Sequence, residues 1–166
     1  MRFECINNQF VELSILGYQF SEITDEWDSN WLLVHINVKS YIKQRKKLEQ
    51  IFWNKTDPAI TTFELKWLIC WFKNISENKV EKYKRMDFTE PNISFELLND
   101  FDSNIKRMRI NFMAEFNPIF KMGTEYSIEL NATNKQLKKY AEELEIELNQ
   151  YPERVEFKKP EKVTQW

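Results

Sequence analysis

The chain is poor in the residues on which nucleotide-binding sites depend. Its 166 residues include only two glycines, Gly17 and Gly123. Phosphate-binding loops need several glycines, because a residue without a side chain lets the backbone approach a phosphate closely, and neither a G-x-G-x-x-G nor a Walker sequence occurs. A nucleotide-binding fold is therefore disfavoured, and we expect no bound cofactor.

Cysteine is equally scarce. Cys5 and Cys70 form no C-x-x-C pair and no ligand spacing with a histidine, so we expect neither a metal site nor a disulfide framework. Cys70 lies in the apolar run Trp67–Phe72 and is interpreted as a small buried side chain. That run, the longest in the chain, is far shorter than a membrane span, and the first residues contain no apolar signal core. A soluble protein of the reducing cytoplasm is expected.

Apolar and charged residues are abundant. The sequence is 42% hydrophobic and 15% aromatic, which is enough for a packed core, and we expect one domain over 1–156 followed by a polar tail at 157–166. The net charge is −2, whereas a general nucleic-acid binder is normally basic. Residues 1–40 carry a net charge of −4 and residues 41–90 one of +4. This asymmetry fits either a solvated surface or the steering of a charged partner.

Candidate catalytic residues are few. The only histidine, His35, stands between Val34 and Ile36 without a nucleophile motif, which favours an exposed or hydrogen-bonded strand histidine over a catalytic one. Asp57, Glu64 and Lys66 superficially match the acidic-x-Lys pattern of metal-dependent nucleases. Residues i and i+2 of a helix face apart, however, and Glu64 is better explained as a helix cap. The sequence therefore predicts no catalytic residue and no enzyme.

Period-two alternation predicts several strands. In the clearest one, Leu32, Val34, Ile36 and Val38 share a face. A weaker apolar stretch from residue 48 is expected to end at the pair Asp57-Pro58. Pro91 keeps Glu90 out of helical geometry, so a sheet resumes after it. Further alternating runs cover residues 11–15, 93–97, 108–114 and 126–130.

Two helices are expected, at about 61–76 and 133–150. Thr61 with Glu64, and Thr133 with Gln136, each match the capping box, in which the first and fourth residues satisfy each other's backbone donors. The first helix is apolar nearly all round, so it must be buried on most sides, with one flank covered by another element or by a partner. The predicted fold class is α+β, a twisted, mostly antiparallel sheet with both helices packed on its inner face.

Five segments of this chain, taken in order, resemble the WapI family of bacterial immunity proteins. The likeness covers roughly residues 9–154. The segments are Leu13–Phe20, Asn30–Leu32, Thr61–Leu65 with Trp67-Leu68, the run Phe-Thr-Glu-Pro-Asn-Ile-Ser-Phe at 88–95, and a C-terminal helix closed by Tyr151-Pro152 and Arg154.

The resemblance implies a cytoplasmic antidote to the C-terminal toxin domain of a secreted wall-associated or contact-dependent inhibition protein. Such an antidote binds its cognate toxin and blocks it without turnover, and some of those toxins act on tRNA. The family pattern brings no catalytic residues. Its matched positions, including Trp31 and Glu90, are interpreted first as determinants of the fold.

An acidic loop at 21–30 is the predicted partner-binding surface. A toxin that is a nuclease has a basic cleft, which an acidic patch would steer towards and occupy. Trp27 in this loop is either an apolar anchor at the interface or folds back onto the sheet. The predicted binding residues are Asp25, Glu26, Trp27 and Asp28, with Asp100 and Asp102 from another predicted turn.

Two other functions stay open. A small-ligand-binding or enzymatic domain would use a pocket between the sheet and helix 61–76. A self-associating module would pair through the same apolar helix.

Overall fold

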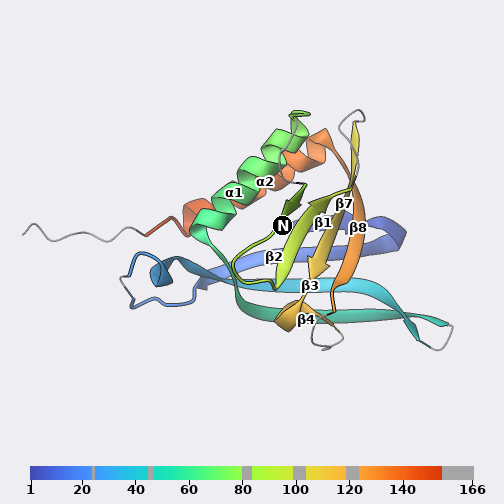
Figure 1. Ribbon diagram of the computed structural model, residues 1–166, viewed down its shortest axis with the longest axis horizontal. Helices are drawn as coiled ribbons and strands as arrows, with labels where there is room; N and C mark the ends of the chain where they lie inside the picture. Colours follow the sequence, from blue (N-terminus) through green and yellow to red (C-terminus); the bar gives the residue numbers. More distant parts are fainter. Residues whose placement is uncertain (24, 45–46, 80–83, 99–103, 119–123, 155–166) are drawn as a thin grey trace, which may run out of the picture.

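The computed structural model describes residues 1–23, 25–44, 47–79, 84–98, 104–118 and 124–154. The predicted tail at 157–166 lies outside these residues. Eight strands form two four-stranded antiparallel sheets, and two helices pack beside them (Figure 1). The α+β class is confirmed. Within the described residues, no helix has the length and apolar character needed to cross a membrane.

The first sheet is a meander whose strands follow one another in chain order. It confirms the alternation in β3, because Leu32, Val34, Ile36 and Val38 are all buried. On the opposite face His35 Nδ1 lies 2.7 Å from the hydroxyl of Thr56, as expected for a hydrogen-bonded strand histidine. The strands are β1 (Arg2–Cys5), β2 (Gln9–Tyr18), β3 (Trp31–Gln44) and β4 (Lys47–Thr61), with a 3₁₀ turn η1 (Ile6–Asn8) between the first two.

The predicted end of β4 at Asp57-Pro58 is wrong. The strand continues to Thr61, with Pro58 paired opposite Leu33 and a register shift next to that pair. Because β4 is the edge strand of its sheet, the backbone donor that proline lacks is not needed by a neighbouring strand. The strand therefore runs straight into the first helix.

The second sheet is another meander. It contains the three strands predicted from alternation and a short additional one at its edge, β5 (Arg85–Met86). The others are β6 (Ile93–Leu97), β7 (Ile105–Phe112) and β8 (Tyr126–Thr133), with a 3₁₀ turn η3 (Ala114–Phe116) after β7. The strands divide into two sheets where one was expected. Each sheet is contiguous in sequence, and helix α1 separates the last strand of the first sheet from the first strand of the second.

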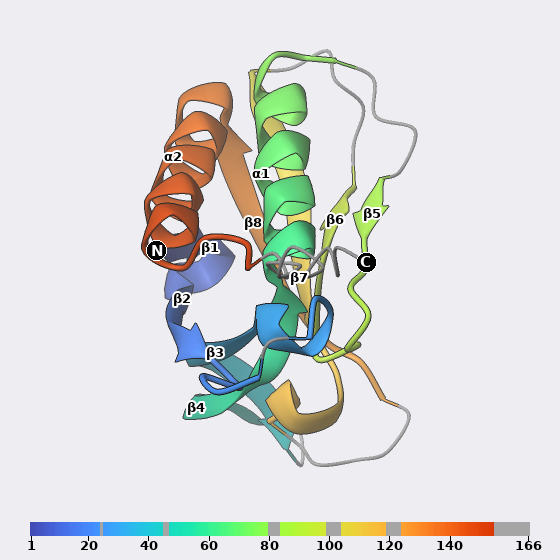
Figure 2. The same cartoon turned by 90° about the vertical axis from the view of Figure 1, so that its left-hand side faces the viewer.

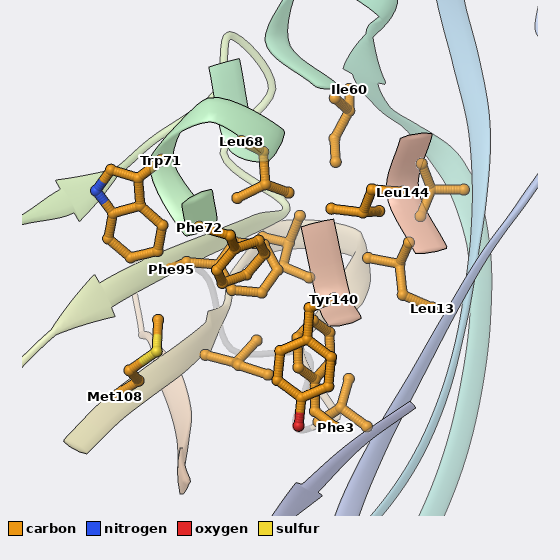
Figure 3. Packing of buried hydrophobic residues seen from close by; sticks show 14 of the residues in the cluster. Phe3, Leu13, Ile60, Leu68, Trp71, Phe72, Phe95, Met108, Tyr140 and Leu144 are labelled. Atoms are coloured by element: carbon orange, nitrogen blue, oxygen red, sulfur yellow. The ribbon is translucent and has the colours of Figure 1, made fainter. Parts of the chain in front are cut away.

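Both helices begin as predicted. Helix α1 (Thr62–Ser76) has Thr61 as its N-cap and α2 (Asn134–Gln150) has Thr133, and in each the capping box is complete. Figure 2 shows the two helices side by side. One shared core joins them to both sheets. Phe3 of β1 lies 5.6 Å from Phe95 of β6 and 4.7 Å from Tyr140 of α2, measured between ring centroids (Figure 3).

Candidate functional site

One flank of α1 is exposed. Its opposite side, with Leu65, Leu68 and Phe72, is buried in the core as predicted. Trp67, in contrast, is 61% exposed, and Cys70 is exposed as well, so the expected burial of Cys70 is wrong. Since the shared core lies on one side of α1 only, Trp67 and Cys70 on the other side remain in contact with solvent.

The 21–30 loop folds back against this exposed flank. The carboxylate of Asp25 accepts hydrogen bonds from the backbone N–H groups of Trp27 at 2.9 Å and Asp28 at 3.0 Å, which sets up the 3₁₀ turn η2 (Asp28–Asn30). The Trp27 ring stacks on Phe63 of α1 with centroids 6.2 Å apart, and it meets Trp31 edge-on at 6.4 Å. Trp27 thus folds back onto the start of α1 and onto Trp31, the first residue of β3, and it stays 50% exposed.

Asn30 fixes the loop to two other parts of the chain. Its buried amide donates to the carbonyl oxygens of Glu26 at 2.6 Å and Arg154 at 2.8 Å. Its oxygen accepts from the hydroxyl of Thr62 and from the backbone N–H of Arg154, each at 2.8 Å. The guanidinium of Arg154 in turn lies 3.6 Å from the centroid of the Tyr18 ring. All four hydrogen-bonding positions of the Asn30 amide are used, so the loop has a defined position.

Between the loop and α1 is a groove of about 550 Å³, called here the aromatic groove. Aromatic rings and carboxylates share its walls, and its one lysine, Lys66, pairs with Glu153. The lining residues are Asp25, Glu26, Trp27, Thr61, Phe63, Glu64, Lys66, Trp67, Thr89 and Glu153. Exposed aromatic side chains beside charged ones are typical of the centre and rim of a protein interface.

The floor of the groove contains a buried carboxylate. Glu64 is 3% exposed, and one of its oxygens accepts from both the backbone N–H (2.8 Å) and the hydroxyl (3.1 Å) of Thr61. Its other oxygen accepts from the backbone N–H of Thr89 at 2.6 Å. Glu64 therefore holds the start of α1 and the segment before Pro91 together. Its role is structural, in agreement with its interpretation as a cap.

The structure brings together only part of the predicted binding surface. Asp25, Glu26 and Trp27 line the aromatic groove, whereas Asp28 lies in η2 and does not. Asp100 and Asp102 lie outside the described residues. Sequence reasoning missed Phe63, Trp67 and Glu153. The spacing of Phe63 and Trp67, one helical turn apart, was the available signal, because residues at i and i+4 share a face.

The aromatic groove does not lie between the sheet and α1, where a ligand pocket would have been expected. Leu68 and Phe72 pack between α1 and the rest of the core (Figure 3), and Leu65 belongs to the same buried cluster. The aromatic groove is instead on the outer flank, at the first turns of the helix. Among the described residues, no group of three or more His, Cys, Asp and Glu side chains is arranged to hold a metal ion.

Comparison with known proteins identifies the family of the chain. No curated protein matches the chain. The model of the immunity protein WapI-like family, however, matches residues 2–152, which include both sheets, both helices and the 21–30 loop. The chain therefore belongs to the immunity protein WapI-like family.

Proposed function

We propose that this protein is a cytoplasmic antidote that binds the toxin domain of a secreted bacterial inhibition protein and blocks it by covering its working surface. It performs no chemistry on the toxin and contacts no nucleic acid itself. The proposal takes its general role from the family and its binding surface from the aromatic groove. Trp27 of the predicted loop and Trp67 of α1, which the sequence did not predict as a binding residue, both line that surface.

The observation that carries the proposal is the position of Trp27. Trp27 shares the aromatic groove with Trp67, which is also exposed, and adjoining exposed apolar side chains mark interaction sites. A ring stack, an edge-on ring and the Asp25 turn hold Trp27 in this position. Rigid aromatic anchors lose little conformational entropy on binding, and they supply much of the affinity of protein interfaces. The carboxylates of Asp25 and Glu26 beside it suit a basic toxin surface such as a nuclease cleft.

Rescue of growth and binding in vitro test the proposal together. Cells that express the cognate toxin domain should survive only when the chain is co-expressed, and the two proteins should form a one-to-one complex. Trp27→Ala should weaken that complex at least tenfold, since hot-spot truncations cost about 2 kcal/mol or more.

Leu48→Ala is the matched control. Leu48 is 70% exposed and lies near the end of the β3–β4 hairpin, at the opposite end of the long axis from the 21–30 loop (Figure 1). It should leave affinity unchanged. Equal loss in both variants, or equal retention, would remove the aromatic groove from the interface.

A small molecule is the second candidate occupant, because the volume of the groove falls within the range of ligand pockets. In that case Trp67→Ala would change the binding of the ligand, and co-expression would give no protection against the toxin.

Self-association through the exposed flank of α1 is the third candidate, since Trp67 there is exposed. Sedimentation over a range of protein concentrations distinguishes it. A dimer that Trp67→Ala dissociates would favour this candidate, and a monomer at all concentrations would favour toxin binding.

A further inference from the structure

A second hollow lies next to the aromatic groove. It has a volume of about 340 Å³ and is enclosed by the end of β4, the segment after Thr89 and the turn η3. We call it the acidic hollow, because three carboxylates surround it, those of Asp57, Glu90 and Glu115. Trp31 and Pro58 contribute apolar walls.

No cation balances these carboxylates within the described part of the chain. The lining contains no lysine or arginine, and none of the three acids takes part in an ion pair found among the described residues. Burial, and then the charges of Glu115 and Glu90, raise the pKa of Asp57 above its ordinary value. The acids are thus close enough to repel one another, which an added cation would relieve.

A buried amide in the wall provides a second and independent sign of a missing ligand. Asn92 is 2% exposed, and its nitrogen donates to the carbonyl oxygen of Pro58 at 3.4 Å. Its side-chain oxygen is buried and has no hydrogen-bond partner among the described residues. Such an acceptor costs free energy unless a donor reaches it. The hollow therefore combines three negative charges with one unsatisfied acceptor, and it needs a positively charged donor.

We propose that the acidic hollow receives an arginine side chain of the toxin domain. This inference rests on the proposed function and names one of its contacts. A guanidinium carries five N–H donors in a plane, so it can bridge carboxylates and still donate to an amide oxygen such as that of Asn92. The apolar walls, Trp31 and Pro58, suit the aliphatic stem and the face of the guanidinium.

The hollow and the groove are two parts of one surface. Thr89 lines the aromatic groove and its neighbour Glu90 lines the acidic hollow. Trp31, in the wall of the hollow, also meets Trp27 edge-on. A toxin domain seated on Trp27 is therefore next to residues that line the hollow.

The first test measures toxin affinity with carboxamide variants of the full chain. Asp57→Asn, Glu90→Gln and Glu115→Gln should each lower affinity for the cognate toxin domain, by roughly tenfold at the best-placed carboxylate, since hydrogen bonds to charged groups are worth about 1.5–3 kcal/mol. Glu49→Gln, an exposed acid on the distant part of β4, is the control and should bind as the unmodified chain does. Each variant should melt at or above the temperature of the unmodified protein, which excludes loss of folding as the cause.

The second test needs no toxin. Acetyl-arginine amide at millimolar concentration should shift the NMR signals of the Asn92 side-chain amide and the Trp31 indole, whereas acetyl-citrulline amide, of the same shape without charge, should not. Asp57→Asn should abolish the shift. Equal shifts with both probes, or none, would overturn the assignment of the hollow to arginine.

The two tests separate the possible failures. If Trp27→Ala weakens the complex while all three carboxamide variants bind normally, the hollow has no part in binding but the proposed function stands. If the arginine probe binds but the toxin does not, the proposed function fails. If Ca²⁺ or Mg²⁺ alone stabilises the protein, and Asp57→Asn removes that effect, the hollow is a metal site and the inference is wrong.

Discussion

Glu64 and Thr89 are joined by a hydrogen bond of 2.6 Å that connects two predicted motifs of the chain. Glu64 belongs to the predicted capping box of α1, and Thr89 belongs to the Phe-Thr-Glu-Pro segment, which lies between β5 and β6 of the second sheet. The same carboxylate therefore closes the first turn of α1 and fixes the segment between the aromatic groove and the acidic hollow. Glu64, which the sequence identifies only as a helix cap, thus also helps to position the proposed binding surface.

Glu64→Ala should lower the free energy of unfolding by about 2–3 kcal/mol, because it removes hydrogen bonds to a charged acceptor and leaves buried donors unpaired. Urea denaturation measures the change. Gln136→Ala is the matched control, because Gln136 closes the other capping box at an exposed site. That substitution should cost only about 0.5–1 kcal/mol. Similar losses in the two variants would show that the bond to Thr89 contributes nothing.

The residues up to Arg154 should contribute to the stability of the fold, whereas those after the predicted domain end at residue 156 should not. A chain ending at residue 156 should have a free energy of unfolding within about 0.5 kcal/mol of that of the full chain, as expected when only a polar tail is removed. A chain ending at Gln150 loses both hydrogen bonds between Asn30 and the backbone of Arg154, and should be at least 2 kcal/mol less stable, roughly the cost of unpaired buried polar groups. Thermal denaturation compares the two. Full stability of the shorter chain would contradict the role assigned to Asn30.

The two cysteines should react at different rates. Cys70 is exposed on α1, whereas burial raises the pKa of the Cys5 thiol to about 12, so Cys5 carries almost no thiolate in the native state. At pH 8, iodoacetamide should modify Cys70 in the folded protein and Cys5 only after unfolding. Mass spectrometry of the digested protein, with and without urea, identifies the modified residue. Modification of Cys5 first would contradict the arrangement of β1.

Stability should fall in alkaline solution. Burial raises the pKa of Tyr140, and that of Cys5, to about 12, whereas the unfolded groups ionise near pH 10 and about 8.5. Above those lower values the unfolded chain releases protons that the folded chain retains, so the free energy of unfolding decreases as pH rises towards 12. Urea denaturation from pH 7 to 11 should show a decrease of about 1.4 kcal/mol per pH unit from Cys5 above about pH 8.5, and a further decrease of about the same size from Tyr140 above about pH 10. Tyr140→Phe should reduce the slope above pH 10 only.

The sequence by itself determined the elements whose signals are local. Alternation in Leu32–Val38 depends only on which face of a strand is buried, and the Thr61–Glu64 and Thr133–Gln136 boxes depend on residues three apart. The ordered segments of the family likewise lie along the chain. The strand was wrongly predicted to end at Pro58. Whether a proline ends a strand depends on whether a neighbouring strand needs its backbone donor, which is a property of the whole sheet.

Only the tertiary structure decided which apolar residues remain exposed and which distant residues meet. Trp67 and Cys70 are apolar residues of the same run as Leu68 and Phe72, so the sequence does not distinguish the two pairs. Trp67 and Cys70 are exposed because they lie on the side of α1 away from the core. The acidic hollow draws on β4, the segment at Glu90 and the turn at Glu115, which are separated by long stretches of chain. Their convergence results from the packing of two sheets against two helices, because burial of the shared core fixes where the polar residues between those elements come together.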